Sequence, residues 1–203
     1  MDETIEKIVR YEYEMLDKVN NKGGRAWCQD HFDAFRIMRA AQFLAWPDEI
    51  RESYLEDLQV AHETGRNLIF EKYAWMMQFS HPEDFAKVEH TLPSFSSSYL
   101  EQVAEIVAIQ LDWAIDFEKR YPNISGTGRP LRSSEDTPWA TSVETYARGE
   151  ISTYSERTVG LYYQFVKACK AGGRNLTTEV RENQLKLQGW KSLDQAEAAA
   201  GQG

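Results

Sequence analysis

The chain has 203 residues, and 23 Lys and Arg against 32 Asp and Glu give it a net charge of −9. A chain of this length makes one ordinary domain, and 42% hydrophobic with 27% charged residues predicts folding rather than disorder. The acidic balance argues against a nucleic-acid partner, because phosphate backbones are bound mainly by Lys and Arg. No apolar run reaches the roughly 18 residues of a membrane span, and the acidic N-terminus lacks a signal-peptide pattern. Because two cysteines cannot build a disulfide framework, we expect a cytoplasmic protein with no membrane partner.

Helical signals run along the whole chain. Ser98 and Ser192 are each followed three positions later by Glu or Gln, a pattern typical of helix starts. Gly65 suits a helix end, where a positive φ is needed. No segment alternates like a strand between turn residues. The expected helices cover residues 3–19, 30–45, 48–63, 67–79, 82–89, 98–119, 139–153, 156–170, 175–188 and 192–198.

These signals predict an all-α fold. Residues 68–79 and 103–117 are apolar nearly all round, which is typical of helices in the middle of a bundle. We therefore predict a single-domain helical bundle of about eight to ten helices over residues 1–190. The tail, 191–203, is rich in Ala, Gly and Gln and is expected to fray.

Part of the sequence recurs 108 residues later. The segment 54–71 shares six of its eighteen positions with 162–179, including Tyr, Gly-Arg-Asn-Leu and Glu. Self-similarity at a fixed offset suggests two related helical halves, 28–80 and 136–188. The alternative is that Gly followed by an Arg-Asn helix cap is a common turn solution that occurs twice.

The segment 121–138 is a long connection between expected helices. Connections of this length are typical of binding or active-site elements in compact domains. Arg129 and Arg132 offer a fork for a carboxylate or phosphate, and Asp136 is suited to cap a helix or orient a ligand. The alternative interpretation is a local turn that only connects the two halves.

Several motifs carry a resemblance to a known family. They are Arg25-Ala-Trp-Cys-Gln-Asp30, Ile37-Met-Arg39, Gln42-Phe43, Gly128-Arg-Pro130, Ser133-Ser-Glu-Asp-Thr-Pro138, Glu144-Thr-Tyr146 and Arg148-Gly-Glu150. With these motifs the chain resembles a mainly bacterial family, domain-of-unknown-function family 4125, over about residues 5–190. The resemblance implies a single all-helical domain. It transfers no catalytic residues, since the family has no assigned activity.

Polar side chains interrupt otherwise apolar helix faces at four positions: Glu12, Gln42, Glu71 and Glu150. An unpaired carboxylate there would be costly and would have a raised pKa. Each carboxylate must therefore pair with Arg, bind metal, stay protonated, or be less buried than the pattern indicates. Arg39 and Arg148 are candidate partners. Raised carboxylate pKa values suit acid/base chemistry near neutral pH.

Metal chemistry is left open by the sequence. Helical bundles that hold two metal ions normally use Glu-x-x-His twice, and none of the four His has Glu three residues before it. A site built from Glu12, Glu71, Glu150 and Glu179 would offer oxygen ligands suited to Mg, Ca or Mn. We expect no resident cofactor, with a divalent metal as the alternative.

The leading functional hypothesis is a small-molecule enzyme of lyase, isomerase or hydrolase type. It would act by acid/base chemistry, without an organic cofactor, on an aromatic or carboxylated metabolite in an inter-helical pocket. The candidate catalytic residues are Glu12, Glu71, Glu150 and Asp136. The candidate substrate-binding residues are Arg39, Gln42, Trp46, Arg132, Glu135, Trp139, Tyr146, Arg148 and Tyr154. The alternatives are a non-catalytic module that binds a ligand or a protein, and a metal-dependent enzyme; the oligomeric state is left open.

Overall fold

A computed structural model describes residues 2–20, 24–126 and 128–202, and over these residues it contains eleven α-helices and no strand. The helices are α1 (Glu3–Asp17), α2 (Phe32–Leu44), α3 (Asp48–Thr64), α4 (Leu68–Ser80), α5 (Pro82–Val88), α6 (Ser97–Arg120), α7 (Pro122–Ser125), α8 (Val143–Ile151), α9 (Glu156–Ala171), α10 (Leu176–Leu187) and α11 (Leu193–Ala200). Short 3-10 turns lie at Trp27–Gln29, Glu89–Thr91 and Ser133–Glu135. The prediction of an all-α, single-domain bundle is confirmed. Within the described ranges, no helix is long and apolar enough to cross a membrane.

The helix starts follow the capping chemistry with one shift in register. Ser192 caps α11, because its side chain accepts from the Gln195 N–H. The start expected at Ser98 lies two residues earlier, where the Ser96 hydroxyl accepts from the Tyr99 N–H. Sequence spacing therefore placed the elements well and their terminal residues less well.

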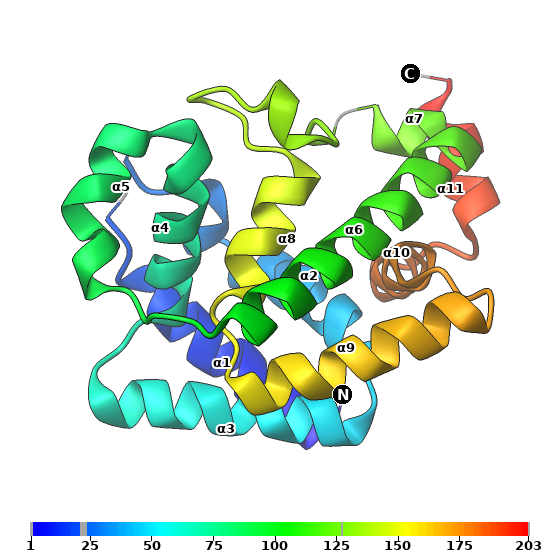
Figure 1. Cartoon of the computed structure of the whole chain (residues 1–203). Helices are drawn as coiled ribbons and strands as arrows, with labels where there is room; N and C mark the ends of the chain where they lie inside the picture. Colours follow the sequence, from blue (N-terminus) through cyan, green and yellow to red (C-terminus); the bar gives the residue numbers. More distant parts are fainter. Residues whose placement is uncertain (1, 21–23, 127, 203) are drawn as a thin grey trace.

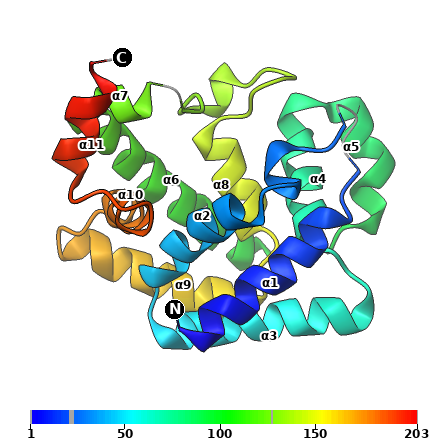
Figure 2. The same ribbon diagram turned by 180° about the vertical axis from the view of Figure 1, so that it is seen from behind.

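The helices pack in a reciprocal pattern. α3 and α9 run along one side of the molecule, α4 and α5 form one flank, and α10 and α11 form the other (Figure 1). α4 packs against α8, and α10 packs against α2. α1 packs against α2, α3 and α4, while α6 packs against α8, α9 and α10. Figure 2 shows the molecule from behind, with α1 and α2 at the front of the view. Exchanging α1–α4 with α6 and α8–α10 thus reproduces the same set of contacts.

The two segments related by 108 residues also share their local geometry. Gly65 and Gly173 have φ values of 72° and 70°, which only glycine adopts at little cost. The next helix is capped in each case by an Asn, Asn67 for α4 and Asn175 for α10. Reciprocal contacts of this kind match a two-fold arrangement, and the place where equivalent residues meet is called the two-fold axis below. The common origin of the two halves by duplication stays a prediction.

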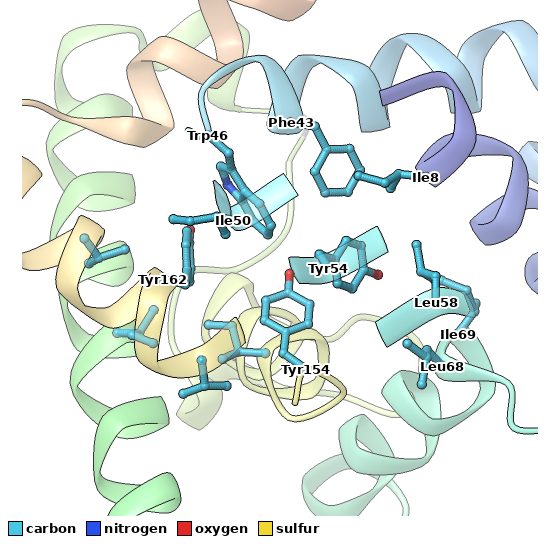
Figure 3. Packing of buried hydrophobic residues seen from close by; sticks show 14 of the residues in the cluster. Ile8, Phe43, Trp46, Ile50, Tyr54, Leu58, Leu68, Ile69, Tyr154 and Tyr162 are labelled. Carbon is cyan, nitrogen blue, oxygen red and sulfur yellow. The ribbon is translucent and has the colours of Figure 1, made fainter. Parts of the chain in front are cut away.

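Aromatic side chains fill the space around this two-fold axis (Figure 3). The rings of Trp46 and Tyr162 lie 4.7 Å apart, and those of Tyr154 and Tyr54 lie 4.9 Å apart. These pairs are equivalents of each other under the 108-residue shift. Trp46 and Tyr154, which are themselves equivalent, are 5.9 Å apart. Aromatic residues make up 12% of the chain, and those around this axis serve as core packing.

Two expectations were wrong. The segment 103–117 was expected to be apolar nearly all round, but Glu105, Asp112 and Asp116 form an exposed edge of α6. The tail expected to fray contains α11, with Leu193 buried. Glu197 holds it in place, because its carboxylate accepts from two backbone N–H groups at the start of α7.

Candidate functional site

Arg39 lies between two carboxylates from distant parts of the chain. Its Nε and Nη2 each lie 2.6 Å from a carboxylate oxygen of Glu12 on α1. Its Nη1 lies 3.1 Å from Oε1 of Glu150 on α8. Because guanidinium is planar and always charged, it can serve both carboxylates in one fixed geometry.

Lys72 is the second cation of the cluster. Its Nζ lies 2.6 Å from Oε2 of Glu150 and 3.6 Å from the centre of the Tyr146 ring. α4 carries Lys72 and packs against α8, which carries both Glu150 and Tyr146. The ammonium group therefore combines an ion pair with a cation–π contact.

Neutral groups complete the hydrogen bonding of both carboxylates. The Tyr54 hydroxyl donates to Glu12 at 2.8 Å, and the Tyr154 hydroxyl donates to Glu150 at 3.2 Å. The Gln42 side chain donates to Glu150 at 2.8 Å and accepts from Arg39 at 2.8 Å. Gln42 and Glu150 are equivalent under the 108-residue shift, so this contact lies at the two-fold axis.

The cluster of Glu12, Arg39, Lys72 and Glu150, called the central ion cluster below, is buried and electrically balanced. Glu12 is 0% exposed and the other three residues are at most 6% exposed. Two negative and two positive charges cancel, which is the condition under which charges persist in a low-dielectric interior.

Charge pairing holds Glu150, Arg39 and Lys72 ionised. Burial by itself raises the pKa of Glu150, but the charges of Arg39 and Lys72 outweigh it and bring the pKa well below its usual range. Burial lowers the pKa values of Arg39 and Lys72, and the adjacent carboxylates reverse that effect and raise both. A proton-transfer group works best with a pKa near the operating pH. Glu150, Arg39 and Lys72 are therefore better suited to fixing charge than to moving protons.

The long 121–138 segment reaches the edge of the cluster through Arg129. The Arg129 guanidinium carbon lies 4.8 Å from the centre of the Tyr146 ring, which Lys72 also contacts. Arg129 is exposed and donates to the backbone and hydroxyl oxygens of Thr141. The half-buried Tyr146 ring thus contacts both a surface cation and a buried one.

Several of the predicted site residues meet in or next to the central ion cluster. They are Glu12, Arg39, Gln42, Tyr146, Glu150 and Tyr154. Trp46 belongs to the aromatic packing beside Tyr154. The helix faces on which these residues interrupted the apolar pattern were therefore informative.

Two further candidates lie in separate ion pairs. Glu71 receives two hydrogen bonds from Arg66, at 2.9 and 2.7 Å. Arg148 lies 3.6 Å from Glu144 on its own helix. Two arginines were considered as partners for the buried carboxylates, and Arg39 pairs with two of these carboxylates, Glu12 and Glu150.

The candidates in the 121–140 region stabilise their own segment. The Asp136 carboxylate accepts from the Ser142 backbone N–H and the Thr145 hydroxyl, at the start of α8. The Glu135 carboxylate accepts from the backbone N–H of Arg132, and Arg132 is exposed. Trp139 is 95% exposed. None of these contacts joins the four residues to the central ion cluster.

Sequence reasoning missed Lys72 and Tyr54. Lys72 is a charged residue on an otherwise apolar helix, the same signal that singled out its neighbour Glu71. Tyr54 was noticed only as part of the repeat. Its burial next to Glu12 depends on how α3 crosses α1, which no local pattern reports.

The four glutamates considered as metal ligands do not gather in one place. Glu12 and Glu150 share Arg39, Glu71 binds Arg66, and Glu179 binds Arg174. Over residues 2–20, 24–126 and 128–202 the structure contains no group of three or more His, Cys, Asp or Glu side chains arranged to hold a metal ion.

Comparison with known proteins identifies the family. A family model described as "Protein of unknown function (DUF4125)" matches residues 2–198. No curated protein and no solved structure matches the chain. The chain belongs to the DUF4125 family, in agreement with the resemblance carried by its motifs.

Proposed function

We propose that this DUF4125 member binds a small carboxylated aromatic metabolite at the Tyr146 ring, between α4, α8 and the 121–138 segment. The observation that carries the proposal is that Lys72 and Arg129 both contact the Tyr146 ring, at 3.6 and 4.8 Å from the ring centre. Cations on an aromatic face attract π systems, and an uncompensated one attracts a carboxylate.

The charge distribution favours an anionic ligand. Lys72 is neutralised by Glu150, but Arg129 donates to the neutral oxygens of Thr141 and keeps its positive charge at the surface. A ligand carboxylate paired with Arg129 would place an attached ring next to Tyr146. The central ion cluster would support this site by holding Lys72 in position.

The geometry supports binding more than acid/base catalysis. Glu150 is paired with two cations that keep it ionised, so it lacks the near-neutral pKa of an efficient proton donor. The enzymatic hypothesis stays a prediction and is tested with the same ligands. The proposal also takes the protein to be cytoplasmic and free of nucleic acid, which its two free cysteines and its charge of −9 support.

The test is a titration with phenylacetate, followed by NMR and thermal shift, with 2-phenylethanol as the uncharged comparison. We expect saturable binding of phenylacetate that perturbs Tyr146. Arg129→Gln should weaken it about tenfold, the loss of one charge-assisted contact. Arg132→Gln removes the same charge from the same segment and should leave binding unchanged.

Two outcomes would count against the proposal. The first is no preference for the acid over the alcohol, and the second is equal binding by Arg129→Gln and the unaltered protein. Conversion of the ligand that stops in Glu150→Gln would instead favour the enzymatic alternative.

A further inference from the structure

A hollow beside Tyr154 is lined by none of the four residues of the central ion cluster. It is a cavity of about 280 Å³ between α3, the turn after it, the segment before α6 and the α8–α9 turn. Its lining includes Asp57, Arg66, Leu68, Phe95, Tyr154 and Ser155. Known ligand sites begin at about this volume and combine apolar walls with a few polar groups, as this lining does.

Asp57 brings a negative charge to this hollow. Its carboxylate accepts from the Ser155 backbone N–H at 3.0 Å, and the Ser155 and Thr158 side chains also hydrogen-bond it, but among the described residues it forms no salt bridge. Arg66 also lines the hollow, but both of its hydrogen bonds to a carboxylate go to Glu71. Arg66 acts on Asp57 only from beyond salt-bridge distance. A half-buried carboxylate without a direct ion pair has a higher free energy than a paired one, and a bound cation would lower it.

The other half of the molecule has a different side chain at the position equivalent to Asp57. The residue 108 positions after Asp57 is Phe165. The Phe165 ring is partly buried against the core and lies 5.5 Å from the guanidinium carbon of Arg174, the equivalent of Arg66. In the second half the large apolar side chain of Phe165 contacts Arg174. In the first half the equivalent residue is the short acidic Asp57, which lines the cavity together with Arg66.

The walls indicate the rest of the ligand. Leu68 is buried, and Phe95 stacks on Tyr99 with ring centres 4.3 Å apart, so Phe95 is held rigidly. Apolar and aromatic surfaces beside one carboxylate suit a cation that carries a short apolar body.

We propose that the hollow beside Asp57 binds a small primary amine, whose ammonium group pairs with the Asp57 carboxylate and whose apolar part lies against Leu68 and Phe95. This site is separate from the one at Tyr146 and takes a ligand of opposite charge. Success or failure of one proposal therefore leaves the other unaffected.

The test uses 2-phenylethylamine as the probe and 2-phenylethanol as its uncharged counterpart, titrated by NMR and calorimetry. We expect the amine to bind with a Kd of about 1 mM or tighter and the alcohol about tenfold more weakly. The amine should shift the amide resonance of Ser155, which donates to Asp57.

Three variants locate the site. Asp57→Asn keeps the size and the acceptor for Ser155 but removes the charge, and it should weaken amine binding about tenfold without affecting the alcohol. Asp57→Phe copies Phe165 into the first half and should abolish binding of both probes. Glu63→Gln removes an exposed acid from the same helix and should bind as the unaltered protein does.

The proposal is overturned if the amine binds no better than the alcohol, or if Asp57→Asn binds it with unchanged affinity. Equal losses in Asp57→Asn and Glu63→Gln would show general charge attraction and would also overturn it. Should Asp57→Phe fail to fold, the nearly isosteric Asn variant decides the question.

Discussion

Two equivalent buried tyrosines, one in each half of the molecule, have different hydrogen-bond partners. In the first half Tyr54 donates to the carboxylate of Glu12 at 2.8 Å. In the second half Tyr162 accepts from the amide of Gln110 at 2.7 Å. Glu12 and Gln110 occupy equivalent positions, each three residues before the carbonyl that receives the Asn side chain of the matching helix cap.

This difference indicates that the helical fold does not require a buried charge at this position. A neutral amide meets the tyrosine in the second half, and Ala147 stands at the position equivalent to Arg39. In the first half the carboxylate needs a cation, and Arg39 supplies it while also reaching Glu150. Neutral groups of similar volume often stabilise a core equally well. The central ion cluster is thus an addition to the fold, which supports a functional role for it.

The largest effect is expected from removing the shared cation. Arg39→Ala leaves Glu12 and Glu150 buried with Lys72 as the one remaining cation of the cluster, and should lower the free energy of unfolding by about 3–5 kcal/mol or more. Urea unfolding followed by circular dichroism measures it. The control is Arg157→Ala, which breaks an exposed pair with Glu56 and should cost less than about 1 kcal/mol. Similar losses in the two variants would mean that the cluster contributes little to stability.

Two substitutions replace the charged groups of the first half with neutral ones, as in the second half. Glu12→Gln and Arg39→Met should each destabilise the fold, because each leaves an opposite charge without its partner. The double variant restores charge balance, since Glu150 keeps Lys72, and it should be more stable than the two single losses predict. A double-mutant cycle in urea should give a coupling of about 1–3 kcal/mol. Additive losses would contradict the view that the second half shows a neutral solution to the same packing.

A smaller effect is expected at the repeated arginine–glutamate pairs. Arg66–Glu71 and Arg174–Glu179 have identical hydrogen-bond lengths, 2.9 and 2.7 Å. Their carboxyl side chains differ in exposure, 6% for Glu71 and 31% for Glu179. Because the more buried charge is harder to leave unpaired, Arg66→Ala should cost about 1–2 kcal/mol more than Arg174→Ala. Urea unfolding of both variants tests this, and equal losses would show that geometry rather than burial sets the energy.

The smallest effect is expected at Asp57, where the second half has Phe165. Burial raises the pKa of Asp57, with a smaller opposing contribution from the Ser155 N–H; Glu56, Arg66, Tyr99 and Glu156 are the charged or titratable groups around it. The folded protein therefore binds this proton more tightly than the unfolded chain does. The resulting stability is complete below the unfolded pKa of about 3.9 and is lost as pH rises through the folded pKa.

Asp57→Asn removes that pH-dependent loss. Its Tm should exceed that of the unaltered protein by about 2–4 °C at pH 7 and should show no gain near pH 3. Scanning calorimetry at both pH values measures the difference, with Glu63→Gln as the control on the same helix. A gain of equal size at pH 3 would point to a cause other than ionisation.

Much of the fold was predictable because its signals are local. Gly65 and Gly173 both adopt the positive φ that suits a helix end, and the boundaries of α3, α4, α9 and α10 lie within one residue of their predicted positions. The start of α8 was placed four residues too early, at 139 instead of 143. Thr137 and Ala140 pair with each other there, and Asp136 accepts from Ser142, so the chain makes a turn before the helix begins.

The candidate site was predictable only in part. Glu12, Gln42 and Glu150 were found because each interrupts an apolar stripe, which is a periodic and therefore local signal. The sequence did not predict that Glu71 lies apart from these residues. Glu71 is instead paired with Arg66, five residues before it. Lys72 was overlooked because a lysine next to a glutamate on a helix is usually exposed to solvent.

The sequence by itself determined an all-helical domain, the approximate extent of most helices and the polar positions that its core would have to accommodate. Only the tertiary structure decided which of those positions meet. Arg39 and Glu150 are 111 residues apart, and their contact exists because α2 and α8 face each other across the two-fold axis. Capping and periodicity act over a few residues, whereas the pairing of buried charges depends on how whole helices pack, and that packing minimises the free energy of the core as a unit.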